Sequence, residues 1–254
     1  MKIQQIRNAT LIVEYAGKRI LIDPMLSEKG KLPPFPGSLR EDNSPNPLEE
    51  LPIPANEVVK NIDGVFLSHL HIDHWDNAAK EILKKDVKIF VQDEADKKEV
   101  ESAGFINVEV LSESTSFDGI ELSRTKAQHG RGEVLKIAGS VCGLVLKHPT
   151  EKTFYIAADT VWYEGVNEAL DLHKPEVISV NGGDNQFVGS GSLVMGKDDI
   201  YEVNKAAPNA TIIVSHMEAV NHFTLTKAEL KDFTAQKGIS SNVLVPDNGE
   251  HYSF

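Results

Sequence analysis

Three histidines and one aspartate lie within six consecutive positions of this 254-residue chain. They follow the pattern His-x-His-x-Asp-His, and its members are His69, His71, Asp73 and His74. Imidazole nitrogens and carboxylate oxygens are the side-chain atoms that bind zinc and similar divalent ions. Alternate side chains of a short loop can point to opposite sides. The run therefore predicts two closely spaced metals, one bound by the first two histidines and the other by the last two residues.

The residues on either side of this run predict the elements that hold it. Residues 64–67 form a short apolar stretch typical of a buried strand. The histidines then follow the carboxyl end of a strand, where open α/β sheets place their chemistry. After the run, Asp76 is a candidate N-cap for a helix that begins at Asn77. A strand and a helix would thus fix the ligand loop from both ends.

Further candidates for metal binding lie later in the chain. His129 and Asp159 each end a stretch that reads as a strand, although Asp159 has the alternative of capping the helix after it. His216 ends the β-branched stretch 211–215, and His222 follows six positions later. We favour His216 as a ligand because strand ends are fixed better than loops, and the reverse assignment stays open. His222 would then face the substrate as an acid that protonates the leaving group.

These residues together resemble the signature of the metallo-β-lactamase superfamily of metallohydrolases, and the resemblance spans nearly the whole chain. It implies an α/β (α+β) fold, the four-layer αβ/βα sandwich in which two facing mixed sheets are flanked by helices. It also implies that His129 completes a three-histidine site with His69 and His71, and that Asp159 bridges the two metals. One departure is Ala158, which stands where the family usually has glycine.

Within the superfamily, the chain most resembles the L-ascorbate-6-phosphate lactonase-like branch. The similar features are the segment 21–26, the close spacing of His216 and His222, and the Gly249-Glu250 pair near the end. This branch assignment rests on fewer residues than the superfamily assignment.

The remaining pattern predicts a single domain over residues 1–254. Residues 1–6, 10–15 and 18–23 read as a meander of three strands, and strands and helices alternate after it. The proline-rich segment 27–56 has almost no periodicity, so we expect a lid-like loop that brings Phe35 to the substrate. A second loop after residue 180 carries Asn185, a candidate for substrate binding.

Composition excludes several classes of partner. The formal charge of −12 and the lack of a basic run disfavour binding of DNA or RNA. No apolar run is long enough to span a bilayer, and the start lacks a signal-peptide core, so we expect a cytoplasmic protein that does not bind membranes. The only cysteine, Cys142, lies in an apolar stretch and is predicted to be a core residue. A homo-oligomer is compatible with the sequence.

The predicted activity is metal-dependent hydrolysis. A hydroxide shared by two divalent ions, oriented by Asp73, would cleave an ester or lactone-type bond in a small molecule. Zinc suits the nitrogen and oxygen ligands best, and manganese or iron would also fit. A phosphodiesterase for a small nucleotide or lipid headgroup is the main enzymatic alternative. A metal-dependent binding or sensor protein without catalysis is the alternative from another class.

Overall fold

The computed structural model describes residues 1–254 and contains two seven-stranded mixed sheets. The strands of the first sheet are β1 (Lys2–Arg7), β2 (Thr10–Tyr15), β3 (Lys18–Ile22), β4 (Gly64–Phe66), β5 (Lys88–Val91), β6 (Val108–Val110) and β16 (His251–Ser253). Those of the second are β7 (Thr115–Phe117), β8 (Ile120–Lys126), β9 (Cys142–Lys147), β10 (Phe154–Ile156), β11 (Val177–Asn181), β14 (Thr211–Ser215) and β15 (Val243–Leu244). Their orders are β16-β1-β2-β3-β4-β5-β6 and β15-β14-β11-β10-β9-β8-β7, and β12 (Gln186–Phe187) pairs with β13 (Gly191–Ser192).

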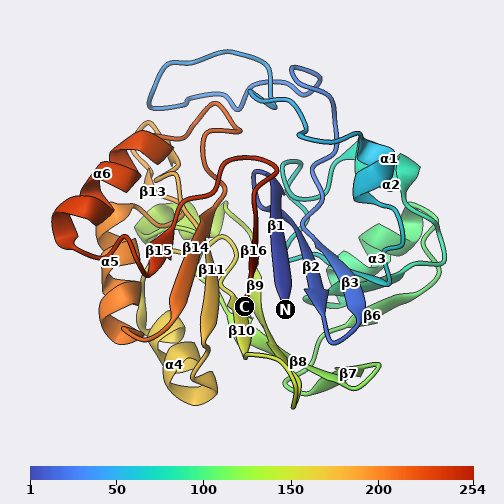
Figure 1. Cartoon of the computed structure of the whole chain (residues 1–254). Coiled ribbons are helices and arrows are strands. Elements are labelled where there is room, and N and C mark those ends of the chain that lie inside the picture. Colours follow the sequence, from blue (N-terminus) through green and yellow to red (C-terminus); the bar gives the residue numbers. More distant parts are fainter.

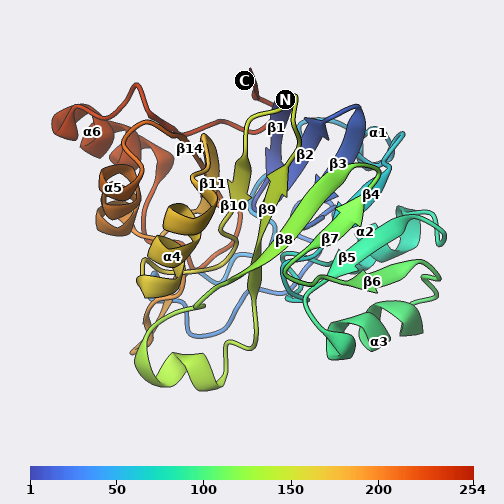
Figure 2. The same cartoon turned by 90° about the horizontal axis from the view of Figure 1, so that it is seen from below.

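The helices cover the outer faces of the two sheets. They are α1 (Ala55–Val58), α2 (Asn77–Ile82), α3 (Glu94–Ser102), α4 (Glu164–His173), α5 (Lys197–Ala206) and α6 (Lys227–Lys237), with a 3-10 turn η1 (Gly132–Lys136). Figures 1 and 2 show α1–α3 beside the first sheet and α4–α6 beside the second. The four-layer metallo-β-lactamase sandwich predicted from the sequence is therefore confirmed. No helix is long and apolar enough to cross a membrane.

Strand periodicity divides the apolar side chains among three layers. On β2, Leu11 and Val13 pack between the sheets, whereas Ile12 faces the helices of the first half. On β9, Leu144 packs between the sheets and Val145 faces α4 and its neighbours. This alternation is the period of two that a β-strand imposes, and it gives each sheet two buried faces. The prediction for Cys142 is confirmed, since it is fully buried between the sheets.

Local sequence signals fix the ends of two helices, and the cap at Asp76 is the one predicted above. The Asp76 carboxylate caps α2 by accepting a hydrogen bond from the Ala79 amide. At α6, Thr226 and Glu229 form a capping box, and the helix ends at Gly238 in the left-handed conformation. The first of these caps lies directly after the histidine run, so it fixes the point where that loop becomes helical.

Strand direction brings distant parts of the chain to one edge of the sandwich. In the second sheet β10, β11 and β14 are parallel, and β8 runs the same way because both β8 and β10 pair antiparallel with β9. In the first sheet β3, β4 and β5 are likewise parallel. The segments after these strands carry the candidate site residues. The loop between β3 and α1 arches over the molecule at the top of Figure 1.

Candidate metal centre

The seven residues predicted as metal ligands all lie in one cluster. Their donor atoms form three groups, and within each group the atoms lie within 4.8 Å of one another. The groups are His69, His71 and His129; His69, His74 and Asp159; and Asp73, His74 and His216. Residues up to 147 positions apart in sequence thus meet at the edge where strands β4, β8, β10 and β14 end. His71 is the only one of the seven that is solvent-exposed.

The Asp159 carboxylate lies at the centre of the cluster. Its Oδ2 is 3.2 Å from His74 Nε2 and 3.5 Å from His129 Nε2, and its Oδ1 is 3.8 Å from His216 Nε2. Oδ2 therefore lies near His129 of the first group and His74 of the third, as an oxygen shared by two metals would. Asp159 does not cap the next helix, because Tyr163 holds the N-cap position of α4.

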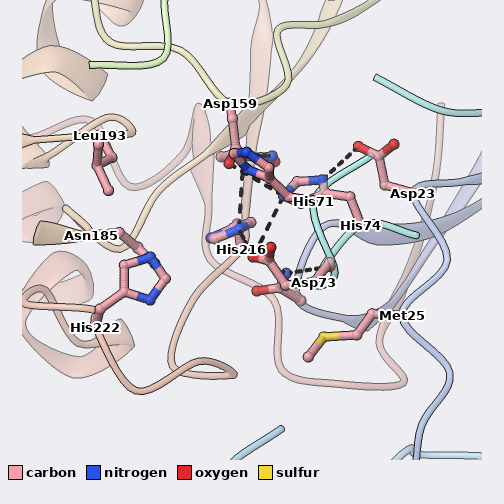
Figure 3. Close-up of polar contacts among 12 residues, drawn as sticks. Asp23, Met25, His71, Asp73, His74, Asp159, Asn185, Leu193, His216 and His222 are labelled. Atoms are coloured by element: carbon pink, nitrogen blue, oxygen red, sulfur yellow. Dashed lines mark hydrogen bonds and ion pairs between the residues drawn. The ribbon is translucent and has the colours of Figure 1, made fainter. Parts of the chain in front are cut away.

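The structure separates the two competing histidines. His216 Nε2 lies 3.2 Å from Asp73 Oδ2, inside the cluster. His222 lies apart from it, and Asn185 Nδ2 is 3.3 Å from its Nε2 (Figure 3). The His222 ring stacks on Phe187 at 4.8 Å and contacts Phe35 edge-on at 4.8 Å. His222 is thus part of the cavity wall, whereas His216 points into the acidic centre.

Buried hydrogen bonds to residues outside the cluster orient the clustered side chains. Asp23 accepts bonds from His74 Nδ1 at 3.0 Å and from the Ser68 hydroxyl and amide at 2.7 and 2.8 Å. Asn181 donates to Asp159 Oδ1 at 2.6 Å, and His129 Nδ1 lies 3.0 Å from the Leu193 carbonyl. Partners of this kind fix the ring orientation and tautomer of metal-binding histidines.

Sequence reasoning did not assign these supporting residues to the site. Asp23 is the last residue of the predicted strand 18–23, and Asn181 is the first residue of the predicted loop after residue 180. The signal that could have found them is their position: each is a polar residue at the carboxyl end of a parallel strand, at the same edge as the candidate ligands.

Three residues in or next to the cluster adopt a backbone conformation that L-residues rarely take. The φ angles are 43° at Asp23, 59° at Ala158 and 61° at His216. The value at Ala158 explains why glycine is usual at that position, because glycine adopts a positive φ without steric cost. Backbone strain of this kind concentrates at functional sites, where it aims side chains that a regular strand would point elsewhere.

The charges of the cluster favour a bound cation. Burial, together with His74 and His71, holds the pKa of His69 well below its ordinary value, so its ring is neutral and able to ligate. Burial alone would lower the pKa of His74, but Asp159, Asp73 and Asp23 outweigh it and raise that pKa well above its ordinary value. Positive charge is therefore favoured between these carboxylates, and a divalent ion supplies it in place of a proton.

The donor atoms also fit a metal sterically. His74 Nε2 is buried and makes no well-formed hydrogen bond, although Asp159 Oδ2 lies 3.2 Å away, so this nitrogen is available to a ligand. His69 Nε2 and His71 Nδ1 lie 2.9 Å apart, near the roughly 3.3 Å expected for two nitrogens on one tetrahedral zinc ion. The residues present therefore suit divalent metals bound by nitrogen and oxygen.

The cluster opens into a cavity of about 320 Å³. Its lining residues are Phe35, His71, Ile72, Asp73, His129, Val134, Ile137, Ala138, Asp159, Asn185, Phe187, Leu193, Val194, His216 and His222. Eight of these 15 residues are hydrophobic, and none is lysine or arginine. Apart from the cluster, only Asn185 and His222 offer polar side chains. This wall suits a small, mostly apolar molecule.

Asn221 ties the long loop after β3 to the wall of this cavity. Its Oδ1 accepts bonds from the Phe35 amide at 2.9 Å and from Asn46 Nδ2 at 3.1 Å. Its Nδ2 donates to the carbonyls of Phe35 and Asp42 at 3.0 and 2.6 Å. Because Asn221 is fully buried beside His222, these bonds hold Phe35 against the His222 ring.

We expect Asn221→Ala to lower the free energy of unfolding by about 2–4 kcal/mol, since it leaves several buried polar groups without partners. Urea unfolding of the purified protein measures this change. Asn43→Ala is the matched control, because Asn43 is exposed in the same loop. A loss below about 0.5 kcal/mol for Asn221→Ala would contradict the anchoring role.

Comparison with known proteins agrees with this geometry. The family described as "Beta-lactamase superfamily domain" matches residues 18–217. The chain belongs to this superfamily. A curated relative in Bacillus subtilis (strain 168), the UPF0173 protein YddR, is 56% identical over 255 residues, which cover 100% of both chains.

Two solved structures resemble this superfamily member over its whole length. The isothiocyanate hydrolase from Delia radicum gut bacteria is 43% identical with a TM-score of 0.95, covering 100% of this chain and 99% of its own. A possible metal-dependent hydrolase from Veillonella parvula DSM 2008 is 35% identical with a TM-score of 0.97 and the same coverage. With the cluster of histidines and aspartates, these relatives show that the chain is a metal-dependent hydrolase of the metallo-β-lactamase fold.

Proposed function

We propose that this enzyme hydrolyses a small uncharged molecule that has an electrophilic carbon and an apolar substituent, and that isothiocyanates are the first class to test. The observation that carries the proposal is the cavity wall, which is mostly apolar and has no basic side chain. The similarity to an isothiocyanate hydrolase at 43% identity supports the choice of class. Water adds to the central carbon of R–N=C=S, and the resulting thiocarbamate splits into an amine and carbonyl sulfide.

The proposed ligands are the seven clustered residues. His69, His71 and His129 would hold one ion, and Asp73, His74 and His216 the other, with Asp159 between them. Zinc is the preferred ion, and manganese or iron also suits these donors. Two bound divalent ions supply a nucleophile from water at neutral pH and polarise the bond under attack. The Asp73 carboxylate could also orient the nucleophile. Asn8 Nδ2 donates a hydrogen bond to the backbone carbonyl of Asp73 at 2.9 Å, which holds this residue in position.

His222 and Asn185 are proposed to bind the heteroatom of the leaving group. Burial lowers the pKa of His222 to about 4, so at neutral pH the ring is uncharged. It would therefore act as a hydrogen-bonding group, rather than as the cationic acid expected from the sequence alone. Its Nδ1 and the Asn185 Oδ1 are buried without partners, which a bound substrate can supply. Phe35 and Phe187 hold the ring in place from two sides.

Ester and lactone hydrolysis is the second candidate, because the same attack on an electrophilic carbon cleaves these bonds. A phosphorylated lactone or a phosphodiester fits less well, since no lysine or arginine lines the cavity to bind a phosphate. We propose a small-molecule substrate and no nucleic-acid partner on the same ground, with the net charge of −12 in agreement.

The test is turnover of four substrate types by zinc-, manganese- and iron-loaded protein. We expect release of amine and carbonyl sulfide from a benzyl or alkyl isothiocyanate to exceed cleavage of a matched ester, lactone and phosphodiester. His222→Phe keeps the stacking surface and is expected to lower kcat/KM about 10²-fold at unchanged metal content. Phosphodiester cleavage as the fastest reaction would reject the proposal. An unchanged kcat/KM in His222→Phe would reject the role of His222.

A further inference from the structure

Exposed apolar side chains gather around the mouth of the cavity. Eight large hydrophobic residues of the chain are exposed, and five of them lie on segments that line or border this cavity. These five are Leu39, Ile72, Leu135, Ile137 and Val188. Ile137 is 82% exposed although it lines the cavity, and Val188 is 71% exposed although it follows the wall residue Phe187. Single exposed apolar residues need no explanation, but a group beside a binding site does.

Apolar residues of the cavity wall have neighbours that are exposed to solvent. Val134 is 7% exposed and Ala138 8% exposed, and both line the cavity together with Ile137. Val188 follows Phe187, another wall residue, and its amide donates to the Gly37 carbonyl of the long loop at 2.9 Å. The apolar residues in and beside the wall thus include both buried and exposed side chains.

The segment that carries Ile137 is held in position by Gly130. This residue follows His129 and has a φ of 104°. A Cβ at position 130 would lie 2.5 Å from Val134 Cγ1, so only glycine permits this close approach. The turn at Gly130 therefore positions both the His129 imidazole and the apolar segment 134–138, and both line the cavity.

We propose that this rim is a binding subsite for the apolar substituent of the substrate, and that the enzyme prefers substituents long enough to reach Ile137 and Val188. The inference rests on the proposed function, because it assumes that the reacting carbon lies at the cluster. At about 30 Å³ per non-hydrogen atom, the cavity of about 320 Å³ holds the reacting group and roughly seven carbons, so a longer chain extends over the rim. Covering Ile137 removes apolar surface from water, which strengthens binding.

Binding of n-alkyl hydroxamic acids to zinc-loaded protein tests the subsite without any hydrolysis. The hydroxamate group chelates the metal, and the alkyl chain is lengthened from acetyl to decanoyl. Calorimetry is expected to show affinity rising up to about fourfold for each methylene that is buried. Ile137→Ser and Val188→Ser should leave acetohydroxamate binding unchanged and weaken decanohydroxamate binding about tenfold. Ile106→Ser is the matched control, since Ile106 is 79% exposed and does not line the cavity.

Three outcomes would overturn the proposal. One is affinity that stops rising after the shortest chains, and another is an equal gain with length in wild type and in both rim variants. The third is a wild-type dimer that Ile137→Ser converts to a monomer, which would assign the rim to contact with a second copy. If acetohydroxamate itself does not bind, the metal centre and the proposed function fail together with the subsite. Normal hydroxamate binding without isothiocyanate hydrolysis would reject only the proposed reaction.

Discussion

Asp159→Asn is expected to lower kcat/KM by at least about 10³-fold and to reduce the metal content of the purified protein. The two carboxylate oxygens face His74 and His129 on one side and His216 on the other. An asparagine has the same shape but lacks the charge, and its amide group would point an N–H at a position that needs an acceptor. Loss of the negative charge also removes the main favourable partner of a cation at His74.

The fold of this variant should persist, because the three large apolar clusters do not include Asp159. Circular dichroism and elemental analysis separate loss of structure from loss of metal. Asp171→Asn serves as the control, since Asp171 is exposed on α4 and pairs only with Lys174. Asp159→Asn protein with a full metal content and activity within tenfold of wild type would remove Asp159 from the centre.

Asp23→Asn is expected to weaken metal binding about 10–100-fold without removing any proposed ligand. Asp23 accepts hydrogen bonds from His74 Nδ1, the Ser68 hydroxyl and the Ser68 amide. Asparagine offers only one acceptor oxygen, so at least one of these buried donors loses its partner and His74 is less well oriented. Asparagine tolerates the positive φ at this position, so the substitution tests hydrogen bonding rather than backbone conformation.

Metal titration monitored by calorimetry measures this effect, and the same sample should lose about 1–3 kcal/mol of unfolding free energy. Asp63→Asn is the control, because Asp63 is an exposed aspartate near the same sheet whose carboxylate accepts a hydrogen bond from the Arg19 amide. Equal metal affinity for wild type and Asp23→Asn would show that the hydrogen bonds accepted by Asp23 do not affect metal binding.

The sequence predicted the fold and the cluster because both depend on local patterns. Alternating apolar residues gave the strands, Asp76 and Thr226 marked helix starts, and the position of each polar residue after a strand gave its place at one edge. Parallel strands end at the same edge whatever the distance in sequence between them. Together with the resemblance to the metallo-β-lactamase pattern, this placed His129, Asp159 and His216 in one cluster before any contact between them was known.

The wall of the cavity could not be predicted in the same way. Ile137 and Val188 lie in irregular segments, where no periodicity tells which way a side chain points. The position of Phe35 depends on hydrogen bonds to Asn221, which lies 186 residues further along the chain. Such contacts follow from how loops pack on one another, and a single sequence contains no local signal for them. The separation of His222 from His216 has the same origin, since the loop between them decides it.

Metal content by elemental mass spectrometry, on protein purified without chelator, tests the central claim most directly. The account predicts about two ions per chain in wild type, fewer in His69→Ala and His216→Ala, and an unchanged number in His222→Ala, whose ring lies outside the cluster. A full metal content in His216→Ala with a reduced one in His222→Ala would reverse the assignment of the last ligand. No metal in any preparation, even after reconstitution, would contradict the metal centre itself.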